Sequence, residues 1–428
     1  MRVVICTIGS GGDVHPYIAL GVELRRRGHE VVLLVNPHFH TRAKAAGLDI
    51  EALGTDEQYA AVIKSPDLIH PTRGPRFVLR TLVREPSREM FVTTRRLIRE
   101  RRADIVVRHL IAFGAGWAAE HEGVPTACGV LAPLFWLSNI DPPAFKRSFF
   151  QNAPVWMRRL RMTIARRLAP FVLTPIVNGA RGDCGLPPVN DAFVREVRGG
   201  DINLGLWSPA YRGPLPDDPP HGYICGFCPF DGAEAMPAAL EHFLDNGPPP
   251  IVFTLGTSVV HHAGEFYAMA ASVARRLNRR AVLLAGEGAE AISGLEPENF
   301  VARYAPFDRL LARGCATVHH GGIGTTGSAL RSGRPMVVVP HANDEFDNAD
   351  RARRLGVSAT VHTNKLNARR LEAALRQILD NPAVAARAES IARSMSGENG
   401  PATAAHALEQ LVARSATQAP AASAAQPA

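Results

Sequence analysis

The sequence predicts an α/β protein built from two facing, doubly wound Rossmann-like halves with a cleft between them. The chain has 428 residues, which is too long for one ordinary core and suits two domains of about 200 residues. Short apolar runs alternate with helical segments in both halves, a pattern typical of parallel sheets covered by helices on both faces. Glycine turns follow several strands, at the strand ends where such sheets bind ligands.

The elements of the first half can be placed in order. Val3–Ile8 is a nearly continuous apolar run, as expected for a strand buried on both faces. Pro16 suits the first turn of a helix at Pro16–Arg27, which Gly28 ends. Further strands are expected at Val31–Val35, Leu48–Leu53, Asp104–Val107 and Thr126–Val130, with helices at Phe39–Ala46, in the arginine-rich segment before residue 104, and at Gly114–His121.

A second alternation begins after the proline-rich loop Gly247–Pro250. Its strands are expected at Ile251–Leu255, Ala281–Leu284, Ala316–Val318, Met336–Val339 and Ala359–His362. Its helices are expected at Glu265–Leu277, Phe307–Arg313, Thr325–Ser332, Phe346–Leu355, Asn367–Leu379, Ala383–Ser394 and Ala402–Arg414.

These patterns predict an N-terminal domain over residues 1–235 and a C-terminal domain over 236–414. The last helix, 402–414, is long enough to pack back on the first domain. Residues 415–428 carry no charged side chain and are rich in Ala, Ser, Gln and Pro, which predicts a disordered tail.

Composition excludes several classes of protein. No apolar run reaches the ~18 residues of a membrane span, and Met1 leads into a strand without the layout of a signal peptide, which predicts a cytoplasmic protein. The formal net charge is +8, but no nucleic-acid-binding motif accompanies it, so a nucleic-acid partner is not expected.

Basic charge gathers in two segments, 73–108 and 146–181, and the second interleaves arginines with aromatic and aliphatic residues. One interpretation is an amphipathic surface that touches an anionic membrane or an acidic amphiphile. The other is a solvated helical face whose apolar side packs on the domain. The sequence leaves both open, and the first would place the protein peripherally at the inner face of a membrane.

The most informative stretch is Val318–Thr326, where a short apolar strand runs into paired histidines and a glycine turn that opens a helix. N–H groups at a helix start have no partner within the helix, and the helix dipole adds positive charge there. Glycines let a bulky anion approach the backbone. The stretch therefore predicts a diphosphate site made by His319, His320, Gly322, Gly324 and Thr325.

The first turn, which contains Gly11 and Gly12, is not the G-x-G-x-x-G of dinucleotide-binding proteins, because Val14 holds the third glycine position. Asp13 lies close to the position of a helix N-cap, so one interpretation is a cap. The other is a general base that faces the cleft. His15 is a competing base, because an unperturbed histidine titrates near neutral pH.

Two further strand ends carry polar groups. Thr257 and Ser258 follow a glycine, where they either bind phosphate or form only a turn. Asp344 and Glu345 follow a buried strand, where they either accept hydrogen bonds from sugar hydroxyls or cap the next helix. A divalent metal is not expected, because these acids share a helix start without a distant ligand set.

Three motifs, taken together and in this order, resemble the inverting nucleotide-sugar glycosyltransferases of the GT-B fold. They are Gly-Ser-Gly-Gly-Asp-Val-x-Pro (9–16), His-His-Gly-Gly-Ile-Gly-Thr-Thr (319–326) and Val-Pro-x-x-x-Asp-Glu-Phe-Asp-Asn-Ala (339–349). The family includes sterol, macrolide, glycopeptide and plant natural-product glucosyltransferases. Among its members the chain resembles most the rhamnosyltransferases of rhamnolipid synthesis.

The resemblance implies a role for each matching position. His319 and His320 would contact the donor diphosphate, Tyr304 would stack on the nucleobase, and Asp344 and Glu345 would hold sugar hydroxyls. Thr257 and Ser258 would assist at the phosphate, and Asp13 or His15 would be the base. Gly327 stands where plant enzymes carry a glutamate for the ribose hydroxyls, which weakens the case for UDP over dTDP.

The function expected from the resemblance is the inverting, metal-independent transfer of rhamnose or glucose from a dTDP- or UDP-sugar to a hydroxyl of a lipophilic acceptor. The aromatic and basic segment 146–171 would suit a hydroxy fatty acid, a lipid, a sterol or another secondary metabolite. No cofactor is implied, because the nucleotide sugar is a co-substrate. The alternatives are a UDP-sugar epimerase of the same fold and a non-catalytic protein that binds nucleotide sugars.

Overall fold

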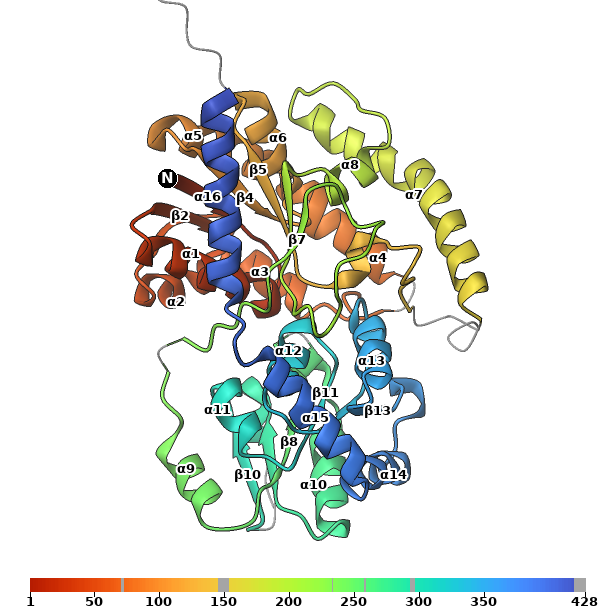
Figure 1. Cartoon of the computed structure of the whole chain (residues 1–428). Coiled ribbons are helices and arrows are strands. Elements are labelled where there is room, and N and C mark those ends of the chain that lie inside the picture. The colour runs from red at the N-terminus through yellow and green to blue at the C-terminus, as the bar shows by residue number, and fades with distance from the viewer. Residues whose placement is uncertain (71–72, 145–153, 233, 258, 293–296, 419–428) are drawn as a thin grey trace, which may run out of the picture.

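The strands of the upper half of the molecule form one parallel sheet (Figure 1). The computed structural model describes residues 1–70, 73–144, 154–232, 234–257, 259–292 and 297–418. Within them, this sheet has seven strands in the order β3-β2-β1-β4-β5-β6-β7. They are β1 (Arg2–Cys6), β2 (Glu30–Val35), β3 (Asp49–Ala52), β4 (Ile105–His109), β5 (Thr126–Val130), β6 (Ile202–Gly205) and β7 (Gly222–Ile224).

Helices and helical turns connect these strands and cover both faces of the sheet. They are α1 (Gly11–Arg26), η1 (Pro37–Phe39), α2 (His40–Ala45), α3 (Asp56–Ile63), α4 (Gly74–Val78), η2 (Leu79–Arg84), α5 (Glu85–Arg101), α6 (Phe113–Glu122), η3 (Pro133–Trp136), α7 (Val155–Asp183) and α8 (Ala192–Arg198). The central strands are apolar because both faces are covered, and Ile5 and Val107 are fully buried.

The lower half contains a second parallel sheet, with six strands among the described residues, in the order β10-β9-β8-β11-β12-β13. The strands are β8 (Ile251–Thr254), β9 (Ala281–Leu284), β10 (Asn299–Ala302), β11 (Ala316–His319), β12 (Met336–Val338) and β13 (Ser358–Thr360). The helical elements are α9 (Ala238–Asp245), η4 (Val259–His262), α10 (Phe266–Arg276), η5 (Gly286–Ala291), α11 (Phe307–Ala312), α12 (Ile323–Arg331), α13 (Glu345–Arg354), η6 (Thr363–Lys365), α14 (Ala368–Leu379), α15 (Pro382–Met395) and α16 (Gly400–Gln418). The two sheets confirm the predicted fold class.

The last helix, α16, returns to the upper half and lies along α1 (Figure 1). Glu409 accepts hydrogen bonds from Arg27 at 3.0 Å and pairs with His29 at 2.8 Å. The helix continues to Gln418, so residues 415–418 are not part of a disordered tail as predicted. Alanine favours helix, and the Ser415 hydroxyl satisfies the Leu411 carbonyl one turn back. Residues 419–428 lie outside the described part of the chain.

Two helix starts also differ from the prediction. Helix α1 begins at Gly11, five residues before Pro16, because Ser10 caps it. Helix α12 begins at Ile323 rather than Thr325, with Gly322 at the N-cap. Both glycine turns are therefore shorter than the sequence suggested, and glycines occupy the first helical turns. Strands β6, β7 and β10 were not predicted. The residues of β7 and β10 are mostly not buried and β6 contains Asn203, so none of the three shows a continuous apolar run.

The exposed apolar side chains of helix α7 contradict the interpretation that the apolar side of this segment packs on the domain. Met162 is buried, but five large side chains spaced along the helix are exposed to solvent: Trp156, Leu160, Ile164, Leu168 and Phe171. The predicted aromatic and basic segment also includes residues 146–153, which lie outside the described residues. Among the residues described, no helix has the length and apolarity that crossing a membrane requires.

The two halves are joined by a buried ionic cluster. Arg351 of α13 pairs with Asp347 one turn away and with Asp141, which precedes α7. The second oxygen of Asp347 accepts the backbone N–H of Ala144 at 2.9 Å. Because both partners of Arg351 are carboxylates, the pKa of its guanidinium rises in spite of burial. This cluster fixes α13 against the upper half, next to the cleft.

Candidate active site

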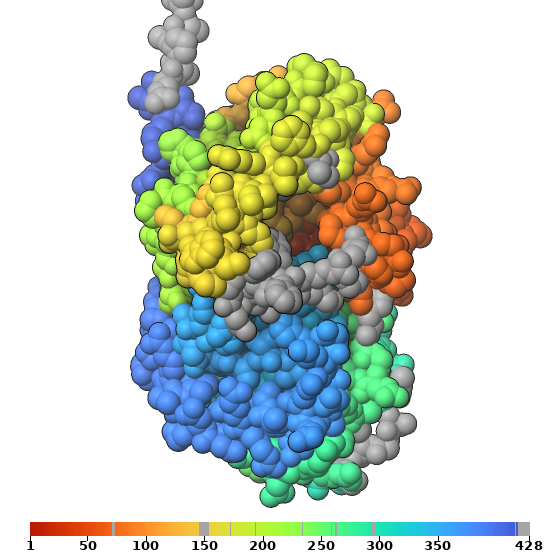
Figure 2. Space-filling view, turned by 90° about the vertical axis from the view of Figure 1, so that its right-hand side faces the viewer, coloured from red at the N-terminus to blue at the C-terminus, as the bar shows by residue number. Residues whose placement is uncertain are grey.

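The carboxyl ends of β1 and β4 in the upper sheet face those of β8 and β11 in the lower sheet across the cleft. A Cβ atom built on Gly11, after β1, would lie 3.2 Å from the Thr257 side chain, after β8. The turn after β1 therefore lies against the turn after β8. On the side shown in Figure 2, the surface is hollowed between the orange segment, the yellow α7 and the blue lower half.

Asp13 is the third residue of α1 and uses one carboxylate oxygen to cap its own helix. Its Oδ2 atom accepts the Ser10 N–H at 2.7 Å and the Ser10 hydroxyl at 3.0 Å. The cap interpretation is thus correct for Oδ2, although the capping residue is Ser10. The other oxygen, Oδ1, points to His109. About a third of the Asp13 side chain is exposed, so a substrate can contact it.

His109, the last residue of β4, was missed by the sequence reasoning. Its Nε2 atom lies 3.6 Å from Oδ1 of Asp13, and its ring meets Tyr17 edge to face. Burial lowers the pKa of His109, and the charge of Asp13 only partly opposes this, so the imidazole is neutral. A signal was present: β4 is the neighbour of β1, so its carboxyl end had to lie beside the first turn.

His15 is not placed as a free base. Its Nε2 atom lies 2.9 Å from a guanidinium nitrogen of Arg42, and because arginine only donates, Nε2 must be the acceptor. Burial, with the charge of Arg42 second, lowers the pKa of His15 to about 4. The ring of Phe230 packs against it. His15 therefore fixes Arg42 at the cleft.

The paired histidines separate into two environments. His319 is enclosed: its Nδ1 accepts the Gly321 N–H at 3.1 Å and its Nε2 contacts the sulfur of Met336. Burial lowers its pKa to about 3. The ring of His320 instead lies between two glycine turns, because a Cβ atom on either Gly256 or Gly322 would collide with it. His320 is thus held between the turns after β8 and β11, and its Nδ1 has no hydrogen-bond partner within the described residues.

The turn after the histidines has the form expected of an anion site. Gly321 has a φ of +100°, a left-handed conformation that favours glycine. Gly322 caps α12, and a Cβ atom on Gly324 would meet open space, so the first turn of α12 is accessible from the cleft. The side chain of Thr325 is buried in that turn. The N–H groups there are available to an anion.

Asp344 and Glu345 have different surroundings. Oε2 of Glu345 accepts the N–H groups of His341 at 2.6 Å and Ala342 at 2.9 Å, so this carboxylate holds the loop that precedes α13. Asp344 accepts one bond from Asn348 at 2.7 Å. Burial raises the pKa of Asp344 to about 6, the Asn348 bond opposes this, and the charge of Asp13 adds to it. Asp13 belongs to the upper half and Asp344 to the lower half, so this charge acts between the two halves.

Asn348 connects three parts of the site. Its side-chain amide donates to the Gly321 carbonyl at 2.8 Å and to Asp344, and its oxygen accepts the hydroxyl of Tyr211 from the upper half at 3.0 Å. The amide thereby fixes the glycine turn relative to the acid. Asn348 lay within a motif quoted for the family resemblance, but nothing in the sequence indicated this role.

Tyr304 lies at the rim of the cleft. The Arg42 guanidinium is 5.6 Å from the centre of its ring, and its hydroxyl donates to the Asp231 carbonyl at 2.8 Å. Burial raises its pKa to about 12, so the hydroxyl stays protonated. Thr257 is exposed beside Gly11, and Ser258 lies outside the described residues. Nowhere in the described chain do three His, Cys, Asp or Glu side chains group as metal ligands would.

Gly327 has no room for a side chain. A Cβ atom there would lie 2.8 Å from the Phe227 ring, which belongs to the segment that leads from β7 to the lower half. A glutamate at this position could not be accommodated without moving Phe227. The packing of the interdomain segment therefore excludes a carboxylate side chain at position 327.

Comparisons with known proteins agree with this arrangement. Residues 3–128 match the glycosyltransferase family 28 N-terminal domain, and residues 280–411 match the C-terminal domain of erythromycin biosynthesis protein CIII-like proteins. The chain is 30% identical to O-mycaminosyltylonolide 6-deoxyallosyltransferase of Streptomyces fradiae, over 96% of this chain and 97% of the relative.

It is also 27% identical to a sterol 3-beta-glucosyltransferase of Arabidopsis thaliana, over 95% of this chain and 65% of that one. The crystal structure of the glycosyltransferase VinC in complex with dTDP superposes with a TM-score of 0.72 at 20% identity, covering 97% of this chain and 100% of that chain. Fold and site thus define a two-domain nucleotide-sugar transferase. The chain belongs to the GT-B glycosyltransferases, among relatives that act on natural products and sterols.

Proposed function

We propose that the protein transfers a hexose from a nucleoside diphosphate sugar to a hydroxyl of a lipophilic acceptor, with inversion at the anomeric carbon. The observation that carries the proposal is one pocket lined both by Gly12, the neighbour of Asp13 in α1, and by Gly324 at the open start of α12. A base on one side and an anion site on the other are what a single displacement needs.

In this mechanism the acceptor hydroxyl gives its proton to Oδ1 of Asp13. Its oxygen forms a bond to the anomeric carbon as the bond from that carbon to the diphosphate oxygen breaks, and the electron pair leaves with the nucleoside diphosphate. N–H groups of the first turn of α12 and the neutral imidazole of His320 donate hydrogen bonds to the charge that develops there. Asp344 holds sugar hydroxyls, and Thr257 reaches the same phosphates.

The donor we propose is a dTDP-sugar, with dTDP-rhamnose first and UDP-glucose second. Phe227 excludes a carboxylate side chain at Gly327, and a deoxyribose needs no partner for a 2′-hydroxyl. A structural neighbour was crystallised with dTDP. The nucleobase would stack on Tyr304, which requires Arg42 to move from the ring face it now covers.

The acceptor we propose is a hydroxy fatty acid, with other lipids, sterols and secondary metabolites as the next candidates. The hollow in the surface is bordered by α7 (Figure 2), and several large apolar side chains of that helix are exposed. One relative is named for O-mycaminosyltylonolide and another for a sterol, which supports a large acceptor of this kind.

The test is a donor and acceptor panel. Purified protein is incubated with dTDP-rhamnose, dTDP-glucose or UDP-glucose, each with and without a 3-hydroxy fatty acid, a sterol or a macrolide aglycone, in the presence of EDTA. Release of nucleoside diphosphate and a glycosylated product only when acceptor is present supports the proposal. Epimerised donor without acceptor identifies an epimerase, and donor binding without turnover across the panel identifies a non-catalytic binder.

A further inference from the structure

Helix α7 carries a stripe of large apolar side chains that nothing in the described molecule covers. Trp156, Leu160, Ile164, Leu168 and Phe171 follow each other at intervals of four and three residues, which places them on one helix face. The exposed fractions of Trp156 and Phe171 are 64% and 77%. Large apolar patches of this kind on a soluble protein mark interaction surfaces.

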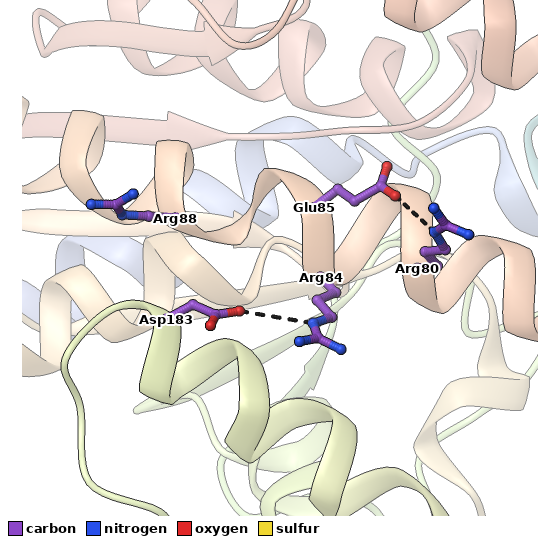
Figure 3. A pocket seen from close by; sticks show the side chains of 5 residues that line it. All are labelled: Arg80, Arg84, Glu85, Arg88 and Asp183. Carbon is purple, nitrogen blue, oxygen red and sulfur yellow. Dashed lines mark hydrogen bonds and ion pairs between the residues drawn. The ribbon is translucent and has the colours of Figure 1, made fainter.

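The same helix is strongly basic. It contains six arginines and one aspartate, and Arg159 and Arg167 are exposed next to the apolar stripe. Near its C-terminal end, a pocket between α7 and the η2–α5 helix is lined by Arg80, Arg84 and Arg88 (Figure 3). Glu85 and Asp183 partly balance these charges. The surface around α7 therefore has an apolar stripe with positively charged side chains beside it.

We propose that this face docks the protein on an anionic phospholipid bilayer, with α7 lying in the plane of the interface. A helix with tryptophan and aliphatic residues on one face and arginines beside them matches such a surface in both polarity and charge. A tryptophan near one end of the stripe is suited to the headgroup level, where its ring is apolar and its N–H is wet. The proposal is independent of which sugar or acceptor the enzyme uses.

The protein contains its own reporter for this contact. Of its four tryptophans, Trp117, Trp136 and Trp207 are at most 1% exposed, whereas Trp156 is exposed. Tryptophan emission that moves to shorter wavelength on contact with lipid must then come from Trp156. We expect this shift, and protection from acrylamide, with vesicles of phosphatidylglycerol and phosphatidylcholine, and neither with vesicles of phosphatidylcholine alone at physiological salt.

Variants separate the apolar and charged contributions. Leu160→Gln combined with Ile164→Gln should weaken co-sedimentation with the anionic vesicles by tenfold or more, because both side chains lose their transfer into the interface. Arg159→Gln combined with Arg167→Gln should weaken it by roughly 25-fold in low salt, at about fivefold for each arginine. Val92→Gln is the matched control, since Val92 is an equally exposed apolar residue on α5 and should change nothing.

Three results would overturn the proposal. The first is no co-sedimentation with anionic vesicles at any salt concentration. The second is binding that the Leu160/Ile164 pair and the Val92 control reduce equally. The third is a stable dimer in sedimentation velocity that the Leu160/Ile164 variant dissociates, because the face would then be occupied by a second copy. Binding of dTDP, measured in parallel by calorimetry, should be unchanged in these variants, because the proposed diphosphate site is at the start of α12 and not on α7. This readout separates the proposal from the proposed function.

Discussion

Nε2 of His109 lies 3.6 Å from Oδ1 of Asp13, at the point where the carboxyl ends of β4 and β1 meet. Oδ2 of the same carboxylate is occupied by the cap of α1, so the two oxygens have separate partners. Oδ1 is left to the imidazole and to any substrate in the cleft. The helix cap therefore uses only one oxygen of Asp13, and we propose that the other acts as the base.

We predict that His109→Gln lowers kcat by about 10- to 100-fold with little change in KM for the donor, because the imidazole orients Oδ1 without touching the nucleotide. The pH profile of kcat should move as well, since a neighbour of the base is removed. His121→Gln, a surface histidine on α6, is the control for a general effect of losing an imidazole. An unchanged profile in His109→Gln would mean that the ring serves only packing.

Asp13→Asn should lower kcat by about 10³-fold, within the range for loss of a general base, while the protein stays folded. The amide oxygen of asparagine can still accept the Ser10 N–H, so the cap largely survives. Ser10→Ala provides the complementary test: it removes a capping hydroxyl and should cost about 1 kcal/mol of unfolding free energy with activity retained. Full turnover in Asp13→Asn would exclude Asp13 as the base.

The two adjacent histidines should respond differently to alanine. His320→Ala should lower kcat by about 10²-fold or more, because a donor to the leaving diphosphate is lost, and leave Tm nearly unchanged. His319→Ala should lower Tm, because it leaves a cavity and an unsatisfied Gly321 N–H, at a cost of about 1–3 kcal/mol for that group alone. Thermal melts and steady-state kinetics on both variants distinguish these outcomes.

Gly327→Glu alone should not create a UDP-sugar enzyme, because the new side chain collides with Phe227. We expect lower Tm and lower activity with every donor. Combining Gly327→Glu with Phe227→Ala makes room for the carboxylate, and the ratio of kcat/KM for UDP-glucose over dTDP-glucose should then rise above that of Phe227→Ala alone. The single Phe227 variant is the control, and an unchanged ratio would disconnect Gly327 from nucleoside choice.

Asp344 should make the protein less stable as pH rises. Its pKa is raised in the fold from 3.8 to about 6, so between these values the unfolded chain has released a proton that the folded chain retains. Stability therefore falls across this window, and above pH 6 the loss is complete. Asp344→Asn removes it, so the variant should gain Tm relative to the parent at pH 7.5 but not near pH 4. Asp380→Asn, at an exposed acid that follows α14, should show no such difference.

The predictability of the site varied with the range of the interactions. The glycine turn at 321–324 was predicted because strand, glycines and helix follow each other in sequence. Its helix start was misplaced by two residues, since a glycine N-cap has no side-chain signature. The distinction between His319 and His320 was not predictable, because it depends on Met336 and Gly256, which other strands supply.

Local order along the chain was sufficient to predict the alternation of strands and helices, the two sheets, and the glycine-rich turns at the strand ends. Periodicity and turn chemistry act over a few residues, so they are legible in one sequence. Tertiary structure alone decided that His109 lies beside Asp13, that Arg42 donates a hydrogen bond to His15, and that Phe227 fills the space at Gly327. These contacts join residues from about 25 to 100 positions apart, and only the packing of the two sheets brings them together.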